Sequence, residues 1–435
     1  MRSKHYIIIP LLLLHAAMPL KAQRHYFLSV DELFERGTQY SLQIKASRLQ
    51  ETVAGEKEKD ARTSRLPHIT INATTGYIGQ PTVFKSGLAH PTHPDVPHWS
   101  HNYNMELTQP LYQGGKIEHS IRKASLESQI ARLSTANDIA GLKLLLLRQY
   151  IDLFTLYKQQ EVLARNIEES KVRLKDIRKM RQEGLLTRND EIRSELELTN
   201  DELAYREAQD GTYIVSQQLD AILGLDEDLL LQPDTCLLHQ PAKLQSCEAY
   251  IAQAYQNYPE LKLARYHTQL AVADKRLTRA GYLPTLSLHA GNTLSRPLSS
   301  TMEDLFSNNW NVALSLSYSL SSLYHNRHKM KEAQQYIYLQ KNAEEQMRQD
   351  IRVKVRSAYI SHNEALDRVN ALQLAVRQAE ENYRIVRNRY MNQLSILTDL
   401  LDAGNIRLQE ELQLTTARAN VIYTYYELQR LCGNL

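Results

Sequence analysis

The amino-acid sequence predicts an α+β membrane protein in which short strands cross the membrane and two very long helices extend away from them. Three observations predict this fold class: the chain repeats itself once, four segments of about ten residues alternate between apolar and polar side chains, and two very long segments contain no proline. The composition agrees, because the 435 residues include only 15 glycines and 13 prolines.

The repeat is visible in two registers. At an offset of 217, Ser29–Leu66 matches Ser246–Leu283, and at an offset of 209, Leu107–Gly224 matches Leu316–Gly433. The registers differ by eight residues, so the first half must contain a longer loop between its two strands. Matched pairs include Gln39/Gln256, Lys45/Lys262, Arg48/Arg265, Asp190/Asp399 and Gly224/Gly433, whereas Leu198/Arg407 is dissimilar.

We therefore expect three segments, with a signal peptide at 1–22, a first repeat at 23–240 and a second repeat at 241–435. The start of the chain has the layout of a secretory signal, since basic residues precede an apolar run that ends in small residues at Ala22. That run of about ten residues is too short to cross about 30 Å of hydrocarbon as a helix. Cleavage is expected after Ala22. Because the residue directly after this site, Gln23, is not a cysteine, a lipid anchor on the new N-terminus is not expected.

The charge balance argues against nucleic acid as a partner, and the hydropathy argues against a transmembrane helix as an anchor. Removal of Arg2, Lys4 and Lys21 with the signal leaves 49 basic residues (52 minus 3) against 49 acidic ones, a balance that does not support nucleic-acid binding. The mean hydropathy is −0.47, and beyond the signal no apolar run is long enough for a membrane helix. Contact with a membrane must therefore use strands.

Each repeat is expected to contain a helix, a strand, a loop, a strand, a very long helix, a turn and a return helix. Ser29 and Glu32 form a capping-box pattern that begins the first helix, which runs to about Arg62. The long helices are expected at about Gly115–Arg181 and Tyr324–Tyr390, each on the order of 100 Å long at about 1.5 Å per residue. Their heptad-like apolar spacing suits packing against neighbouring helices. An ordinary coiled coil would explain these helices, but not the strands.

The strand segments are cleanly divided into two faces. Trp310, Val312 and Leu314 alternate with Asn311, Ala313 and Ser315, which are small or polar. Strands of about ten residues with one apolar and one polar face are typical of tilted strands that cross an outer membrane. Four strands cannot close a barrel, for which about eight are the minimum, so several copies must pool their strands. The expected strands are roughly 67–78, 102–112, 284–294 and 309–320.

Aromatic side chains lie near the ends of these strands, where a girdle at the membrane interface would need them: Tyr77, Trp99, Tyr103 and Trp310. The alternative is a pair of soluble hairpins in which Trp310 and Tyr103 pack in a core.

Two local motifs, together with the order of elements, carry a family resemblance. Residues Gln109–Gly115 read QPLYQGG, similar to a "PLF.GG" segment before the long helix, and Tyr390–Ala403 matches the more specific tip. Over essentially the whole mature chain, the sequence resembles the TolC-like outer membrane factors, also called outer membrane efflux proteins.

The resemblance implies a homotrimer in which each protomer gives four transmembrane strands to a shared 12-stranded β-barrel among the outer-membrane lipids. Long helices would form an α-helical barrel through the periplasm. It also implies a periplasmic adaptor (a membrane fusion protein) and an inner-membrane transporter as partners that dock at the tip. The expected function is the passive exit channel of a tripartite efflux or type I secretion system, without a cofactor. The cargo stays open among small molecules, metal ions and proteins.

The resemblance also assigns gating residues. Asp399 and Asp402 match the acidic residues of the periplasmic constriction, and their spacing of three places both carboxylates on one helix face. Three copies would form two acidic rings that favour cations. Tyr390 and Asp190 match residues that hold the closed tip together by hydrogen bonds. Ser395 stands where the family often has a basic residue, so the resemblance does not decide whether a salt bridge also locks this tip. The alternative is that Asp399 only caps its helix.

Two groups of side chains have open interpretations. The longer loop of the first half, residues 79–101, could bind a transition metal or could be a solvated extracellular loop; it carries His90, His93, Asp95, His98 and His101. Cys236 and Cys247 could form a disulfide outside the cytosol, while Cys432 leaves the number of cysteines odd.

Enzyme signatures are absent from the sequence, including GxGxxG, HExxH, CxxC and the nucleophile elbow. Gly114-Gly115-Lys116 does not make a phosphate loop, because Pro110 stands in place of its first glycine and Ile117 in place of its hydroxyl. The sequence thus predicts a passive pore and no enzyme. A periplasmic coiled-coil adaptor or scaffold and a secreted hydrolase with a helical stalk are the alternatives.

Overall fold

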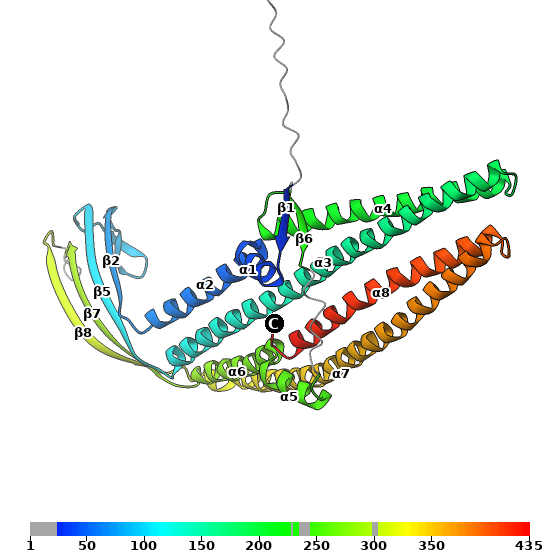
Figure 1. Cartoon of the computed structure of the whole chain (residues 1–435). Helices are drawn as coiled ribbons and strands as arrows, with labels where there is room; N and C mark the ends of the chain where they lie inside the picture. Colours follow the sequence, from blue (N-terminus) through cyan, green and yellow to red (C-terminus); the bar gives the residue numbers. More distant parts are fainter. Residues whose placement is uncertain (1–23, 228, 235–243, 298–302) are drawn as a thin grey trace, which may run out of the picture. The chain divides into compact units, whose positions relative to one another are not determined.

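The computed structural model describes residues 24–227, 229–234, 244–297 and 303–435. The predicted signal peptide, residues 1–22, and Cys236 lie outside the described residues. Figure 1 shows the order of the elements along the chain. In the first half they are β1 (Arg24–Leu28), α1 (Val30–Tyr40), α2 (Leu42–Thr63), β2 (His68–Tyr77), β3 (Val83–Ser86), β4 (Ala89–Thr92), β5 (Trp99–Gln113), α3 (Lys116–Gln182), α4 (Arg188–Leu223) and β6 (Leu229–Pro233).

The described part of the second half follows the same order without the small strands. Its elements are α5 (Cys247–Asn257), α6 (Pro259–Ala280), β7 (Thr285–Arg296), β8 (Ser307–Ser317), α7 (Ser322–Met391) and α8 (Leu397–Leu431). The two very long helices are confirmed, since α3 has 67 residues and α7 has 70. The boundaries of the two repeats, at 23–240 and 241–435, stay a prediction.

The prediction of one helix from Ser29 to about Arg62 is wrong in one respect, because the segment forms two helices. Ser41 has an extended conformation (φ −57°, ψ 123°), so α1 ends at Tyr40 and α2 begins at Leu42. The second half breaks at the matching position, Tyr258, which precedes Pro259 at the first position of α6. Proline favours the first turn and forces the residue before it out of the helix. The first half has leucine instead of proline there, which is why local pattern gave no signal for the break.

The capping interaction at the start of α1 is confirmed in part. The hydroxyl of Ser29 accepts a hydrogen bond from the backbone N–H of Glu32 at 3.2 Å. The carboxylate of Glu32 accepts a hydrogen bond from the hydroxyl of Tyr26. This contact ties the first turn of α1 to the preceding strand β1.

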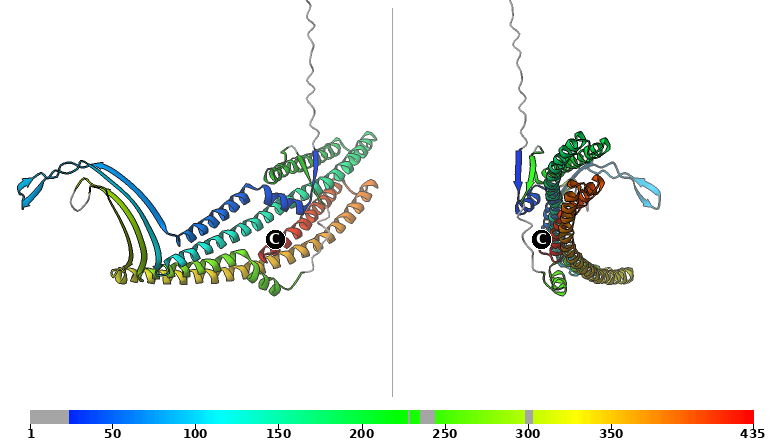
Figure 2. Two further views of the ribbon diagram at one scale, coloured as in Figure 1. Left: turned by 90° about the vertical axis from the view of Figure 1, so that its left-hand side faces the viewer. Right: turned by 45° about the vertical axis from the view of Figure 1, so that its right-hand side comes forward.

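The four predicted strands are confirmed and form one antiparallel sheet in the order β2-β5-β7-β8, whose strands lie side by side in Figures 1 and 2. β5 begins at Trp99, three residues before the predicted start, because its first residues pair with the end of β2. β8 ends at Ser317 rather than at residue 320. The register aligns side chains of one kind across the sheet, as in Ile69↔Leu107↔Ala290↔Val312 on one face and Asn72↔Asn104↔Thr293↔Asn309 on the other.

The chain divides into two compact units. The sheet unit comprises the described residues within Glu35–Arg148, His239–Leu374 and Asn420–Leu435, and it holds the four-stranded sheet. The tip unit comprises the described residues up to Phe34 and within Gln149–Leu238 and Ala375–Ala419. None of the described helices combines the length and the apolar character that a membrane-crossing helix requires.

The core of the sheet unit joins helices from both ends of the second half. Tyr250 of α5, Ile351 of α7, Leu428 of α8 and Cys432 are all buried and pack together. Burial raises the pKa of the Cys432 thiol to about 11, so this thiol is protonated at neutral pH. Cys432 is therefore a small core residue.

The tip unit contains a two-stranded parallel sheet of β1 and β6, held by one buried tyrosine. The hydroxyl of Tyr150 on α3 donates to the carbonyl of Leu28 at 2.7 Å and accepts from the backbone N–H of Asp234 at 2.8 Å. Burial raises the pKa of this hydroxyl to about 12, so it stays a donor throughout the neutral range.

Replacing Tyr150 by phenylalanine should lower the free energy of unfolding by about 1–2 kcal/mol, because buried backbone groups lose a partner while the ring packing is kept. Thermal unfolding of the purified protein measures this change. The matched control is Tyr213→Phe, which removes a hydroxyl from a half-buried ring of α4. Equal melting temperatures for Tyr150→Phe and the wild type would show that the hydrogen bonds of Tyr150 add no stability.

Candidate pore-lining face and helix tips

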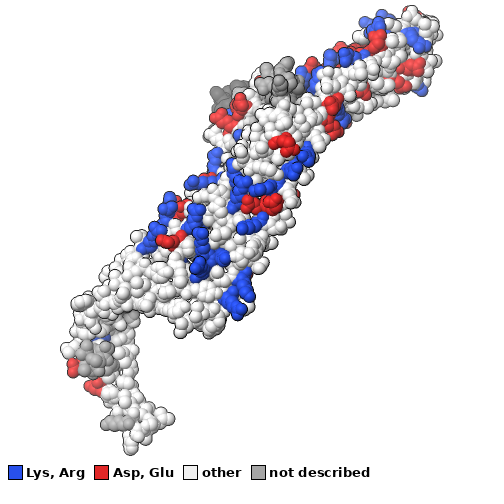
Figure 3. Space-filling view, turned by 90° about the horizontal axis from the view of Figure 1, so that it is seen from below, with Lys and Arg blue, Asp and Glu red and all other residues white. Residues whose placement is uncertain are grey.

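The four-stranded sheet has one apolar and one polar face, as the sequence predicts. In the single chain the apolar face is open to its surroundings, with Trp310 73% and Leu316 70% exposed. The polar face carries amide and hydroxyl side chains, together with Glu106, His68 and His289. Charged side chains are scarce on the strands and frequent on the helices, which is visible on the face drawn in Figure 3.

All four predicted interface aromatics lie on the apolar face. Tyr77 pairs with Trp99 at the far end of β2 and β5, where the two rings meet edge to face at 5.9 Å between centroids. Tyr103 and Trp310 lie further along the strands, and both side chains are exposed in the single chain. The alternative in which Tyr103 and Trp310 pack in a soluble core does not fit this exposure.

The longer loop of the first half contains a small hairpin of β3 and β4, and most of its residues are exposed. Its histidines have separate neighbours: His98 stacks on Tyr77, and His101 hydrogen-bonds to Thr75 at 2.7 Å. Within the described ranges, no three His, Cys, Asp or Glu side chains converge as a metal site would need.

At the tip, a capping box begins α4. Thr187 accepts a hydrogen bond from the backbone N–H of Asp190 at 3.3 Å, and the Asp190 carboxylate accepts from the hydroxyl and the N–H of Thr187. Gly184, with φ 76°, provides the left-handed conformation that the preceding turn needs. Asp190, predicted to hold the tip closed, thus also fixes the start of its own helix.

Tyr390 is 5% exposed at the end of α7, and its hydroxyl has no hydrogen-bond partner within the described part of the chain. Burial, followed by the nearby charge of Asp190, raises the pKa of Tyr390. The structure therefore brings Asp190 close to Tyr390 without a hydrogen bond between them. The hydrogen bonds that the resemblance implies for this pair stay a prediction.

Asp399 and Asp402 are both exposed on the first turns of α8. The hydroxyl of Ser395 donates to the carboxylate of Asp399 at 2.7 Å. The serine that stands in place of the family's basic residue thus stabilises the start of α8. Arg193 on α4 donates to the hydroxyl of Thr398 at 2.8 Å and so brings a guanidinium to this turn.

Further carboxylates near Asp402 were not predicted from the sequence. Burial, followed by the charge of Asp201, raises the pKa of Glu197 on α4, and Asp402 contributes to the same shift. Asp201 is buried and accepts a hydrogen bond from Ser170 at 2.7 Å. Glu197 of α4 therefore adds to the acidic surface that Asp402 begins on α8, whereas Asp201 is buried.

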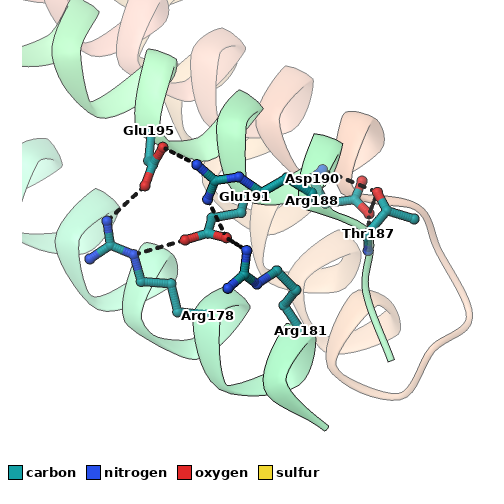
Figure 4. A network of polar contacts seen from close by, with 7 residues as sticks. All are labelled: Arg178, Arg181, Thr187, Arg188, Asp190, Glu191 and Glu195. Carbon is teal, nitrogen blue, oxygen red and sulfur yellow. Dashed lines mark hydrogen bonds and ion pairs between the residues drawn. The ribbon is translucent and has the colours of Figure 1, made fainter. Parts of the chain in front are cut away.

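The α3–α4 tip is held by a network of ion pairs, drawn in Figure 4. The side chain of Glu191 is 7% exposed and contacts Arg188 at 2.6 Å, Arg181 at 2.7 Å and Arg178 at 3.3 Å. Arg178 also reaches Glu195 at 2.8 Å. These guanidinium groups, Arg188 first, lower the pKa of Glu191.

The α7–α8 tip has an apolar cluster at the matching positions. At the offset of 209, Arg181 corresponds to Tyr390, Arg188 to Leu397 and Glu191 to Leu400. These three residues of the second half are buried together with Ile177 of α3. The two tips are therefore fixed by different forces, one ionic and one hydrophobic, although they share a position in the repeat.

Arg407 was noted in the sequence only as a mismatch with Leu198. Its guanidinium lies 2.6 Å from the Glu169 carboxylate of α3 and 4.2 Å from the ring centroid of Tyr383 on α7. Arg407 therefore holds α8 against two other helices of the tip unit. A charged residue that replaces an apolar one at a matched repeat position is the signal that could have indicated this contact.

Comparisons with known proteins agree with this arrangement. Residues 250–434 match the family model described as outer membrane efflux protein. Over these residues the chain is similar to outer membrane efflux proteins. This match confirms the resemblance to the TolC-like family and supports a role in outer-membrane efflux. No curated protein matches the chain in sequence.

Solved structures show that the fold of the efflux protein domain extends through the first half of the chain. VceC of Vibrio cholerae is 15% identical with a TM-score of 0.78, and the match covers 93% of this chain and 96% of that one. CusC is 14% identical with a TM-score of 0.81 and 96% coverage of both chains. The open state of the MtrE channel of Neisseria gonorrhoeae is 18% identical with a TM-score of 0.74, covering 93% of this chain and 89% of that one.

Proposed function

We propose that this protein is the exit channel of a tripartite efflux or type I secretion system, formed by a homotrimer in the outer membrane. Substrates would pass from an inner-membrane transporter and a periplasmic adaptor through the helices and then through the strands. The observation that carries the proposal is the four-stranded sheet with one apolar and one polar face.

That sheet is incomplete in a single chain. β2 and β8 are its outer strands, and each has a partner on one side only among the described elements. Unpaired backbone N–H and C=O groups cost several kcal/mol each in hydrocarbon, so the edges must pair with other copies. Three copies, the number that the resemblance implies, give a closed sheet of twelve strands with the apolar face toward lipid and the polar face toward the pore.

The helix tips support the assignment of the gate. Asp399 and Asp402 lie on one exposed face of α8, and the carboxylate of the half-buried Glu197 on α4 lies near Asp402. In a trimer these groups would surround the axis and favour cations over anions. We assign Asp399, Asp402, Tyr390 and Asp190 to the gate, and Tyr77, Trp99, Tyr103 and Trp310 to the membrane interface. The adaptor and the transporter would dock at the tip.

Single-channel recording in planar lipid bilayers tests the proposed channel. The detergent-purified wild type is expected to insert and to show small, cation-selective conductance steps, because the acidic groups restrict the tip. Extraction is the companion measurement, since a channel requires detergent whereas a periplasmic adaptor or scaffold stays soluble. Folded oligomers that never conduct would contradict the channel and favour the structural role.

A further inference from the structure

The polar face of the sheet carries a single charged residue, Glu106 of β5. On this face the other side chains of β2, β5, β7 and β8 are amides, hydroxyls, small residues and the two histidines His68 and His289. The other charged residue in these strands, Arg296, lies on the opposite face, where it pairs with Asp304 at 2.6 Å. Glu106 therefore sets the permanent charge of this face.

His289 lies next to this charge. Its Nδ1 atom is 3.9 Å from Oε1 of Glu106 and 3.1 Å from the hydroxyl of Thr108. Both side chains are partly exposed: the exposed fraction is 52% for Glu106 and 37% for His289. They are therefore accessible to water and ions on the polar face.

The register keeps the space beside Glu106 open. Glu106 pairs directly with Gly291 of β7, which in turn pairs with Asn311 of β8. A Cβ atom at Gly291 would lie 2.9 Å from Oδ1 of Asn311, so a larger residue there would displace that side chain. The glycine leaves the carboxylate of Glu106 without a bulky cross-strand neighbour.

We propose that Glu106 and His289 form a second selectivity site, within the strands, that makes the preference of the pore for cations depend on pH. This inference rests on the proposed channel. Three copies would place three carboxylates in a ring on the pore face, each with an imidazole beside it. The site is separate from the acidic residues of the helix tips.

The chemistry follows from the two side-chain types. A carboxylate is charged throughout the neutral range, whereas an imidazole gains its charge between about pH 8 and pH 5. Three carboxylates at about 10 Å from an ion in water change its occupancy by roughly fivefold to tenfold. Protonated imidazoles would cancel that charge, and protonation of His68 would add positive charge to the same face. Acidification should therefore remove the contribution of this site to the preference for cations.

The test is the reversal potential of single channels in a dilute KCl gradient, measured at about pH 8 and about pH 5. The wild type should prefer K⁺ over Cl⁻ at the higher pH. At the lower pH its selectivity ratio for K⁺ over Cl⁻ should be about fivefold smaller. Glu106→Gln should have a weaker preference for K⁺ than the wild type at the higher pH, because only the acidic helix tips still contribute, and a weaker one again at the lower pH. His289→Gln should match the wild type at high pH and lose less of its preference on acidification.

Two controls separate this site from other charges. His101→Gln changes a histidine on the opposite face of β5 and should leave both reversal potentials unchanged. Asp399→Ala/Asp402→Ala changes the tip but should keep the wild-type response to pH. If Glu106→Gln and His289→Gln both conduct with wild-type reversal potentials at both pH values, the inference is overturned. A wild type that does not conduct overturns the proposed channel, and the site with it. His289→Gln serves as the independent test if Glu106→Gln does not assemble.

Discussion

Replacing Asp399 and Asp402 together by alanine is expected to raise the single-channel conductance severalfold and to weaken the selectivity for cations. Both carboxylates are exposed on α8, and in a trimer they would contribute six negative charges to the narrowest part of the pore. Their removal should widen the aperture and abolish the electrostatic binding of cations there. Planar-bilayer recording of the two purified proteins measures the effect.

The control for this variant is Asp226→Ala/Glu227→Ala, which removes two exposed carboxylates of the tip unit from the segment after α4. This control should conduct like the wild type. If the Asp399/Asp402 variant also conducts like the wild type, the channel stands but the gate assignment is wrong. Asp399 would then only stabilise the first turn of α8, together with Ser395.

Asp220→Asn is expected to raise the thermal stability of the protein at alkaline pH. Asp220 on α4 is fully buried, and neither carboxylate oxygen has a hydrogen-bond partner within the described residues. Burial, followed by the charges of Asp226 and Glu227, raises the pKa of Asp220 to about 7. An isosteric amide avoids the cost of a buried, unpaired charge.

The sign of the pH dependence follows from the raised pKa. The folded state holds the proton up to about pH 7, whereas an unfolded aspartate releases it near pH 3.9, so the wild type should lose stability as the pH rises between these values. We expect a loss of about 2 kcal/mol, because solvent screens the exposed charges of Asp226 and Glu227. In Asp220→Asn this part of the pH dependence should disappear.

Melting temperatures of both proteins at about pH 5 and about pH 8 measure this difference. The stabilisation by Asp220→Asn should be larger at the higher pH. Asp210→Asn is the control for the loss of one negative charge on α4, and because Asp210 is exposed, this change should alter the melting temperature little. A wild type whose stability does not fall between the two pH values would show that Asp220 is not protonated in the folded protein.

The two long helices and the four strands of the large sheet followed from the sequence to within a few residues, whereas the short strands β1, β3, β4 and β6 were not predicted. Absence of proline and continuous helix-forming composition are local properties, and they placed α3 and α7 within two residues of their observed ends. The alternation in β8 placed its apolar face because side-chain direction in a strand is fixed by position alone. The break at Ser41 was missed, since leucine follows it where the second half has Pro259.

The candidate site was predictable only in part. Family motifs indicated Asp399, Asp402, Tyr390 and Asp190, and the structure adds their neighbours, among them Ser395 and Glu197. The ion pairs of Glu191 lie within one helical hairpin, yet charged residues on a helix are usually solvated, so pattern alone did not single them out. Arg407 and Glu169 are 238 residues apart and meet only through packing of α8 against α3.

The sequence by itself determined the class of fold, the repeat, the long helices and the two faces of each strand, because periodicity and chain stiffness act over neighbouring residues. Tertiary structure decided which side chains from distant segments meet. Strand register placed His289 and Gly291 of β7 beside Glu106 of β5, and helix packing buried the Asp220 carboxylate without a hydrogen-bond partner among the described residues. These outcomes depend on contacts between segments far apart in the chain, whose geometry is set only when the backbone pairs and the helices pack together.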